Sequence, residues 1–330
     1  MLRRKRPLTG SVLAVLAVAC SGEGNGSDPV EERAPEPPEE SVSLAPLSDT
    51  SGFVVAGETR IHYTALGEGS PVLIIHGGPG LDQAYMRPWL DRIGDFARAV
   101  YYDQRGTGRS TGPMTTEEIN FDDFVLDVDR VREAMGYESV TVLGHSWGGI
   151  LALAYARAHP DKVDGLILLS TAEPGTQFAA QTQLNSREAR SEEELARMQE
   201  IQASEAFAAG EPSAVSEIFK IAFRGTLADP SDLAKLNLEL AESTAGNQQA
   251  VTGLLQQTMI QPEWWSELSG MEVETLILHG RHDPLPVEMA QALGDSIPGA
   301  TTVVLRDSGH FPFAEEPERV LEEIRSFVAR

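Results

Sequence analysis

The sequence predicts an α/β fold with a mostly parallel central sheet, helices on both faces and an all-helical cap insertion. Three observations support this prediction. Short apolar, β-branched runs alternate with helical patterns over most of the chain, as in parallel sheets. The alternation stops once, between about residues 172 and 270, where only helical patterns occur. With 330 residues, 41% of them hydrophobic, the chain can form one large domain with such an insertion.

The N-terminal 51 residues are expected to precede the folded domain. Residues 1–19 begin with basic side chains and continue into an apolar run too short to span a bilayer, which predicts an export signal. Small residues before the lone cysteine, Cys20, resemble a bacterial lipoprotein signal, in which that cysteine is lipidated; an ordinary cleaved signal peptide is the alternative. Residues 20–51 are rich in Pro and Glu, which predicts a disordered linker. We therefore expect an exported protein, lipid-anchored in the bacterial cell envelope or, in the alternative, periplasmic or secreted.

Two segments, 52–171 and 271–330, are expected to form the α/β core. Alternating residues predict a hairpin from Phe53–Ala56 and Thr59–Thr64. Continuous apolar runs, typical of buried parallel strands, follow at Pro71–Ile75, Arg98–Tyr102, Val140–Leu143, Gly165–Leu169, Thr275–Leu278 and Thr301–Leu305. The helical stretches between them are Phe121–Met135, Ile150–His159, Val287–Ser296 and Pro317–Val328.

The helical patterns of residues 172–270 predict a cap over the carboxyl edge of the sheet, where sheets of this kind place their sites. A separate helical domain beside the sheet is the alternative. Ser191-Glu-Glu-Glu194 is a capping box that opens a helix closing near Gly210. Further helices are expected at Ser213–Phe223, Asp232–Glu242 and Gln248–Ile260.

The hexapeptide Gly144-His-Ser-Trp-Gly-Gly149 stands between an expected strand and an expected helix. This setting is typical of a nucleophile elbow, a sharp turn that exposes a serine hydroxyl at the top of a sheet. Glycines flank Ser146 because side chains would clash in so tight a turn. We expect Ser146 to be a nucleophile; a Gly/Ser turn without chemical meaning is the alternative.

A nucleophilic serine needs a base, and the base needs an orienting acid. Asp283 follows one expected strand and His310 follows the next, so both can meet Ser146 at one edge of the sheet. The order Ser, Asp, His is that of the α/β-hydrolase triad. The other histidines are expected to be structural; they are His62, His76, His145, His159, His279 and His282.

Hydrolysis through an acyl-enzyme also needs two backbone N–H groups that hold the oxyanion. The residue after the nucleophile, Trp147, is expected to give one. The second is expected from His76-Gly-Gly-Pro-Gly80, where glycines let the backbone approach a substrate. Within that loop Gly78 is the first choice and Gly77 the second.

Taken together, His76-Gly-Gly-Pro-Gly80, Asp103-Gln-Arg-Gly-Thr-Gly-Arg-Ser110, the Ser146 hexapeptide, Gly280-Arg-His-Asp283 and Ser308-Gly-His310 resemble the proline iminopeptidase family of α/β-hydrolases. The resemblance implies the α/β-hydrolase fold and removal of an N-terminal residue, typically proline, from peptides. It also implies that Asp103 and Arg105 brace the oxyanion loop. The family binds the free amine with glutamates near the cap. The cap of this chain offers Glu173, Glu205, Glu217, Glu239 and Glu242, and none can be aligned with the family pattern.

The expected function is therefore that of a serine hydrolase cleaving proline or another small N-terminal residue from peptides. A carboxylesterase or other small-acyl hydrolase is the alternative, and a non-catalytic binding module is a third. Fifty acidic against 26 basic residues give a net charge of −24, which argues against nucleic acid as a partner. The histidines are not clustered at ligand spacings, so no metal or organic cofactor is implied. A membrane is a partner only through the lipid anchor, and the oligomeric state stays open.

Overall fold

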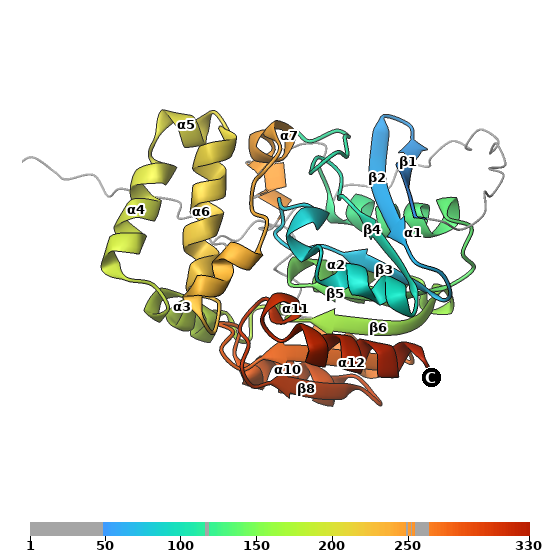
Figure 1. Cartoon of the computed structure of the whole chain (residues 1–330). Coiled ribbons are helices and arrows are strands. Elements are labelled where there is room, and N and C mark those ends of the chain that lie inside the picture. The colour runs from blue at the N-terminus through green and yellow to red at the C-terminus, as the bar shows by residue number, and fades with distance from the viewer. Residues whose placement is uncertain (1–48, 116–118, 249, 252, 255–263) are drawn as a thin grey trace, which may run out of the picture.

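The computed structural model describes residues 49–115, 119–248, 250–251, 253–254 and 264–330. These residues form a sheet of eight strands with helices on both faces and a helical cap beside one end (Figure 1). The strand order is β1-β2-β4-β3-β5-β6-β7-β8. β2 is antiparallel to both of its neighbours, β1 and β4, and every other neighbouring pair is parallel. The predicted α/β class with a mostly parallel sheet is confirmed.

The strand bounds follow the apolar runs of the sequence. They are β1 Thr50–Ala56, β2 Thr59–Leu66, β3 Pro71–Ile75, β4 Arg98–Tyr102, β5 Val140–His145, β6 Val163–Leu169, β7 Thr275–Gly280 and β8 Thr301–Leu305. Register brings the carboxyl ends of the central strands to one edge, because Ile75 pairs with Gly144 and His145 pairs with Leu169. The loops that carry polar residues after these strands therefore open on the same edge.

Two hydrophobic cores cover the two faces of the sheet. On one face pack α1 Phe121–Ala134, α2 Trp147–Ala158 and α10 Val287–Ser296, through residues such as Val128, Leu151 and Leu293. On the other face pack α12 Pro317–Val328 and the 3₁₀ helix Leu90–Asp95. Short helices complete the core: the 3₁₀ helices Gln83–Met86 and Pro160–Lys162, and α11 Pro312–Glu315.

The described residues between 172 and 270 contain helices and no strand. The cap helices are α3 Ala179–Glu188, α4 Glu192–Gln202, α5 Glu205–Ala208, α6 Pro212–Arg224, α7 Glu242–Gly246 and α9 Trp264–Glu267, with 3₁₀ helices at Pro230–Lys235 and Leu268–Gly270. Both reciprocal hydrogen bonds of the expected capping box are present between Ser191 and Glu194.

Two expected cap helices are wrong in their extent. The helix opened by Ser191 ends at Gln202 rather than near Gly210, because the Ser204 hydroxyl accepts the Phe207 N–H and starts α5. No helix spans Asp232–Glu242. There Leu236, Leu238 and Leu240 are buried while the residues between them are exposed, an alternation typical of extended chain.

Several expectations fall on residues beyond those described. The predicted signal of residues 1–19, most of the 20–51 linker and Cys20 lie there, although β1 already begins at Thr50. The expected helix Gln248–Ile260 lies there in large part. Within the described ranges, no helix has both the length and the apolar character needed to cross a membrane.

Candidate active site

Ser146, His310 and Asp283 meet at the carboxyl edge of the sheet. Ser146 follows β5, Asp283 follows β7 and His310 follows β8. The His310 Nε2 atom lies 3.0 Å from the Ser146 Oγ, and its Nδ1 lies 2.8 Å from the Asp283 Oδ2. With the ring proton on Nδ1 and donated to Asp283, Nε2 is left to accept the Ser146 hydroxyl proton. All three residues are buried.

The backbone of Ser146 adopts a φ of 54°, in the left-handed region that few non-glycine residues visit. Close packing on both sides explains why the neighbouring positions are glycines. A Cβ at Gly144 would collide with the Gly148 carbonyl, and a Cβ at Gly148 would collide with the Ile75 carbonyl. The turn therefore holds the serine hydroxyl above the start of α2, as the elbow motif predicts.

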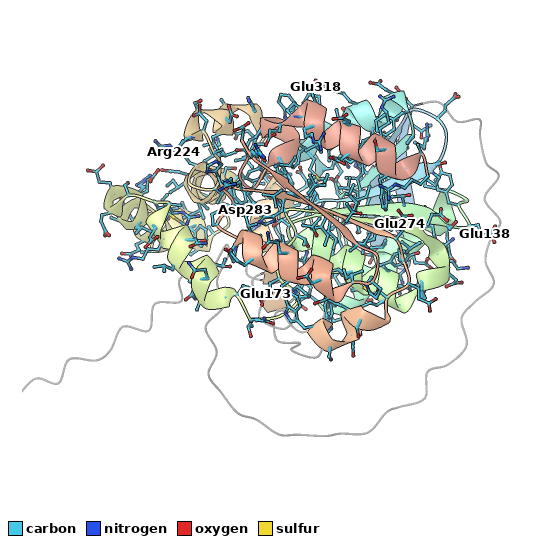
Figure 2. All side chains as sticks on the ribbon, turned by 90° about the horizontal axis from the view of Figure 1, so that it is seen from below. Glu138, Glu173, Arg224, Glu274, Asp283 and Glu318 are labelled. Carbon is cyan, nitrogen blue, oxygen red and sulfur yellow. The ribbon has the colours of Figure 1, made fainter. Side chains whose placement is uncertain are left out.

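Asp283 is held as a carboxylate despite its burial. Burial alone would raise its pKa, but the adjacent His310 ring and the Leu285 N–H, which donates to Oδ1 at 3.0 Å, bring the pKa below its ordinary value. Figure 2 shows Asp283 near the middle of the view and Glu318 at the edge of the molecule. Because it stays ionised, the Asp283 carboxylate can orient and stabilise a protonated His310.

The glycine loop after β3 lies against the nucleophile, because a Cβ at Gly77 would come within 3.0 Å of the Ser146 Cβ. The Gly77 N–H donates to the Tyr85 hydroxyl at 2.7 Å, so it is already engaged. The Gly77 carbonyl accepts from His76 Nδ1 at 2.9 Å. In a trans peptide the N–H points opposite the C=O, so the Gly78 N–H points away from His76. It has no hydrogen-bond partner among the described residues.

A buried hydrogen-bond chain links this loop to the elbow and to the base. Tyr85 Oη lies 2.7 Å from His145 Nδ1, and His145 Nε2 lies 2.8 Å from the His310 carbonyl. Burial and the neighbouring His310 lower the pKa of His145 to about 3, so its ring is neutral. The carbonyl can only accept, so His145 donates from Nε2 and accepts the Tyr85 proton at Nδ1. Sequence reasoning treated His145 as structural and did not identify Tyr85.

Replacing Tyr85 with phenylalanine is expected to lower kcat about tenfold with little change in KM, because the Gly77 peptide loses its anchor beside the nucleophile. The buried Gly77 N–H and His145 Nδ1 lose their partner, so the free energy of unfolding should also fall by about 2 kcal/mol. Steady-state kinetics and urea unfolding measure both effects. Tyr102→Phe is the matched control, since the Tyr102 hydroxyl is buried without a partner among the described residues. Equal kinetics in the two variants would contradict the anchoring role.

Asp103 and Arg105 have separate partners, and only one of them supports the oxyanion loop. Asp103 accepts from the Gln83 backbone N–H at 3.2 Å and from its side chain at 3.0 Å, just beyond that loop. Arg105 instead forms a bidentate pair with Asp127 of α1, at 2.8 and 2.9 Å, so its expected bracing role is wrong. Gln104, which sequence reasoning missed, binds His76 through its backbone N–H at 2.9 Å. A motif shows that residues belong together but not which neighbour each one faces.

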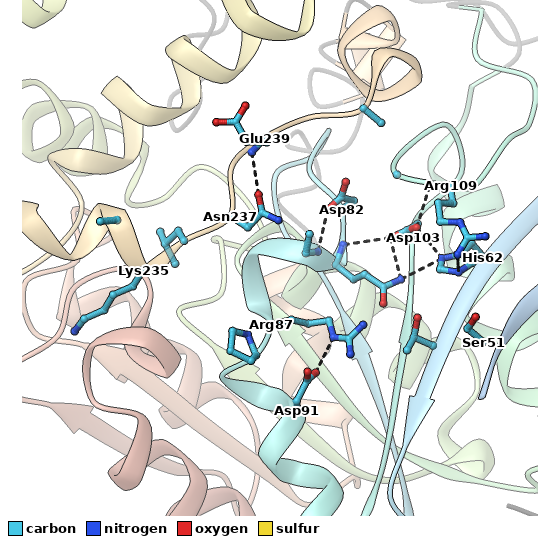
Figure 3. A pocket seen from close by; sticks show the side chains of 18 residues that line it. Ser51, His62, Asp82, Arg87, Asp91, Asp103, Arg109, Lys235, Asn237 and Glu239 are labelled. Carbon is cyan, nitrogen blue, oxygen red and sulfur yellow. Dashed lines mark hydrogen bonds and ion pairs between the residues drawn. The ribbon is translucent and has the colours of Figure 1, made fainter. Parts of the chain in front are cut away.

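Asp103 borders a pocket of about 990 Å³ between the core and the cap segment 234–241 (Figure 3). Its carboxylate also accepts from His62 Nδ1 at 3.0 Å and from the Arg109 N–H at 3.0 Å. Burial would raise the pKa of Asp103, yet these hydrogen bonds bring it below its ordinary value. None of the three residues Ser146, Asp283 and His310 lines this pocket.

At pH 7 the free energy of unfolding of the Asp103→Asn variant is expected to be about 3 kcal/mol lower than that of the wild-type protein, because buried donors lose their charged acceptor. The folded-state pKa lies below the ordinary 3.8, so this stabilisation is fully present above pH 3.8 and is lost as the pH falls through the folded value. Urea unfolding of both proteins at pH 7 and below pH 4 measures it. If the difference in free energy of unfolding between the two proteins stayed constant with pH, the ionised Asp103 carboxylate could not be its cause.

The remaining predicted structural histidines lie outside the triad. His279 Nε2 donates to the Leu285 carbonyl at 2.9 Å, and the His159 ring packs against Tyr155. Over the described ranges, no group of three or more His, Cys, Asp or Glu side chains is placed to hold a metal ion.

Comparisons with known proteins add the following similarities. A family model described as alpha/beta hydrolase fold matches residues 70–317. A proline iminopeptidase from Heyndrickxia coagulans is 28% identical over 84% of this chain and 98% of that protein. One from Arabidopsis thaliana is 45% identical over 31% of this chain, but the match spans only 26% of that protein. An esterase from Thermogutta terrifontis superposes with a TM-score of 0.65 at 24% identity, over 85% of this chain and 98% of that one, a likeness of fold.

Proposed function

The chain belongs to the alpha/beta hydrolase fold family, and on that premise we propose that it is a serine hydrolase that removes an N-terminal residue from short peptides. One observation carries the proposal: Ser146 Oγ, His310 and Asp283 form a continuous hydrogen-bonded chain at 3.0 and 2.8 Å. This is the arrangement that makes a serine hydroxyl nucleophilic.

The geometry supports an acyl-enzyme mechanism. His310 Nε2 takes the Ser146 proton while Oγ adds to the substrate carbonyl carbon. His310 then gives that proton to the leaving amine, and the C–N bond breaks. His310 then takes a proton from water, whose oxygen adds to the ester carbonyl carbon, and returns that proton to the Ser146 Oγ as the bond between the acyl carbon and Oγ breaks. Asp283 holds the imidazole in the required tautomer throughout.

The oxyanion is proposed to bind the N–H groups of Gly78 and Trp147. Trp147 is the first residue of α2, so its N–H has no acceptor within the helix. The Gly77 N–H, the second choice from the sequence, already donates to Tyr85. The positive charge of a helix N-terminus adds to the stabilisation of the developing anion.

Similarity to named proline iminopeptidases supports a peptide substrate with a free N-terminal amine and proline or another small first residue. A carboxylesterase, or another small-acyl hydrolase, is the alternative. Hydrolysis of prolyl and alanyl arylamides, compared with short-chain aryl esters, tests the choice. Arylamide turnover that disappears on N-acetylation supports the aminopeptidase. Ester turnover without arylamide turnover would overturn it in favour of the esterase.

Glu173 is the proposed partner of the substrate amine, because it alone is buried among the five glutamates considered in the cap. Glu217 and Glu239 form ion pairs at the surface with Arg197 and Lys220. Glu173 follows Ala172, whose N–H donates to the Ser146 carbonyl at 3.0 Å. Burial raises the pKa of Glu173, although the Phe178 N–H, at 2.8 Å, lowers it.

The Glu173→Gln variant is expected to raise KM for amine-bearing substrates about tenfold, because a charge-assisted hydrogen bond is lost. Turnover of aryl esters, which carry no amine, should stay unchanged. Steady-state kinetics on both substrate classes measure this. Glu217→Gln, which alters a surface pair, serves as the control. A KM change of equal size for esters would contradict amine binding.

Export to the bacterial cell envelope and lipidation at Cys20 are also proposed. They are supported by the basic start, the short apolar run and the small residues before that cysteine. Cys20→Ser in the full-length chain should release the protein from the membrane fraction. Unchanged membrane association would count against lipidation, and retention of the unprocessed chain in the cytoplasm would count against export.

A further inference from the structure

Glu315, the last residue of α11, holds three backbone N–H groups with one carboxylate. It accepts from Ala228 at 2.7 Å, from Gly309 at 3.0 Å and from Phe311 at 3.1 Å. Gly309 and Phe311 are the two neighbours of His310. Ala228 belongs to the cap, four residues after the end of α6. One side chain thus joins the cap to both sides of His310.

The same piece of cap also contacts His310 directly. The His310 N–H donates to the Thr226 carbonyl at 2.8 Å. A Cβ at Gly309 would collide with that carbonyl, so the contact requires glycine there. The Phe223 ring of α6 meets the Phe311 ring edge-on, with centroids 4.9 Å apart. The segment after α6 and the loop that carries the base therefore pack as one unit.

A neutral side chain such as glutamine could not accept the same three N–H groups as the Glu315 carboxylate. The three donors approach two oxygens, and an amide side chain offers only one oxygen. Glu315 forms no ion pair among the described residues, so the backbone N–H groups offset the cost of removing its charge from water. Burial raises the pKa of Glu315, and these three N–H groups oppose the rise. A half-buried carboxylate kept at this cost indicates a specific role.

We propose that Glu315 is a positioning residue that couples the cap to the catalytic base. When the segment around Ala228 is in place, the carboxylate fixes the Gly309 and Phe311 amides and so sets the distance between His310 Nε2 and Ser146 Oγ. Displacement of that cap segment withdraws the base from the nucleophile. The inference rests on the proposed serine hydrolase function, but it does not depend on which substrate is cut.

The test uses the full-length chain and a fluorophosphonate, whose reaction with Ser146 needs the base but no particular substrate. In Glu315→Gln the amide NH₂ would face an N–H donor. We expect the rate of labelling at saturating probe to fall about tenfold, and kcat for any turned-over substrate to fall with it while KM stays within about twofold. Glu316→Gln is the matched control: Glu316 accepts the Asp307 N–H at 2.8 Å, and within the described ranges its side chain has no hydrogen bond to the cap or to the neighbours of His310.

A second variant, Ala228→Pro, removes the cap donor and leaves the Glu315 carboxylate and both loop amides in place. It should slow labelling as Glu315→Gln does. Labelling at the wild-type rate in Glu315→Gln, with only a lower thermal transition, would overturn the positioning role. Slow labelling in Glu315→Gln but not in Ala228→Pro would overturn the coupling to the cap. Absence of labelling in the wild-type protein would instead refute the serine hydrolase itself.

Discussion

Replacing Ser146 with alanine is expected to lower kcat about 10⁶-fold, the size of effect found when a triad serine is removed. The Ser146 Oγ is the atom that bonds to the substrate, and it lies 3.0 Å from its base. The hydroxyl has no other side-chain partner among the described residues, so its loss should change the free energy of unfolding by less than about 1 kcal/mol. Kinetics on the best substrate of the panel and urea unfolding measure the two quantities.

Ser170→Ala is the matched control for this variant. Ser170 is also a buried serine at the carboxyl end of a strand, with a φ of 41°. Its hydroxyl has no hydrogen-bond partner in the described part of the chain. Fluorophosphonate labelling should vanish in Ser146→Ala and persist in Ser170→Ala. Labelling that persists in Ser146→Ala would refute the assignment of the nucleophile, and a wild-type protein that never labels would favour the binding module.

The core could be predicted from sequence because its signals are local. Pro71–Ile75 is apolar over its whole length and Thr301–Leu305 is rich in β-branched residues, and the structure gives both runs those same bounds. Ser146, Asp283 and His310 could be singled out because each lies at or shortly after the end of such a run. In a parallel sheet, neighbouring strands end at one edge, so position along the chain fixes position in space.

The cap and the support of the site could not be predicted in this way. Leu236, Leu238 and Leu240 alternate in burial against the cap and core, which only the assembled structure supplies. Tyr85 and His145 are 60 residues apart, and Glu315 meets Ala228 across 87 residues. No local pattern marks such pairs, because the two members lie far apart along the chain. These contacts decide how well the base is placed, whereas the motif decides only which residue is the base.

Replacing Asp283 with asparagine is expected to lower kcat about 10⁴-fold while KM changes little. The reason lies in the second oxygen of the carboxylate. The Leu285 N–H donates to Oδ1 at 3.0 Å, so the amide oxygen of asparagine would keep that bond and its NH₂ would face His310. The imidazole would then have to accept at Nδ1 and carry its proton on Nε2, where it can no longer take the Ser146 proton.

A control variant separates the orientation of the His310 ring by Asp283 from the general effect of removing one negative charge near the site. Asp307→Asn removes a charge from the exposed loop that leads to His310 and should leave kcat within about twofold. Because the folded-state pKa of Asp283 lies below its ordinary 3.8, a wild-type protein assayed at pH 5 keeps this carboxylate ionised, so acid does not reproduce the variant. Kinetics of Asp283→Asn from pH 5 to 9 measure the effect. A loss of less than about tenfold would mean that His310 is oriented chiefly through its own backbone, bound by Thr226 and His145, and through the neighbouring amide that Glu315 holds.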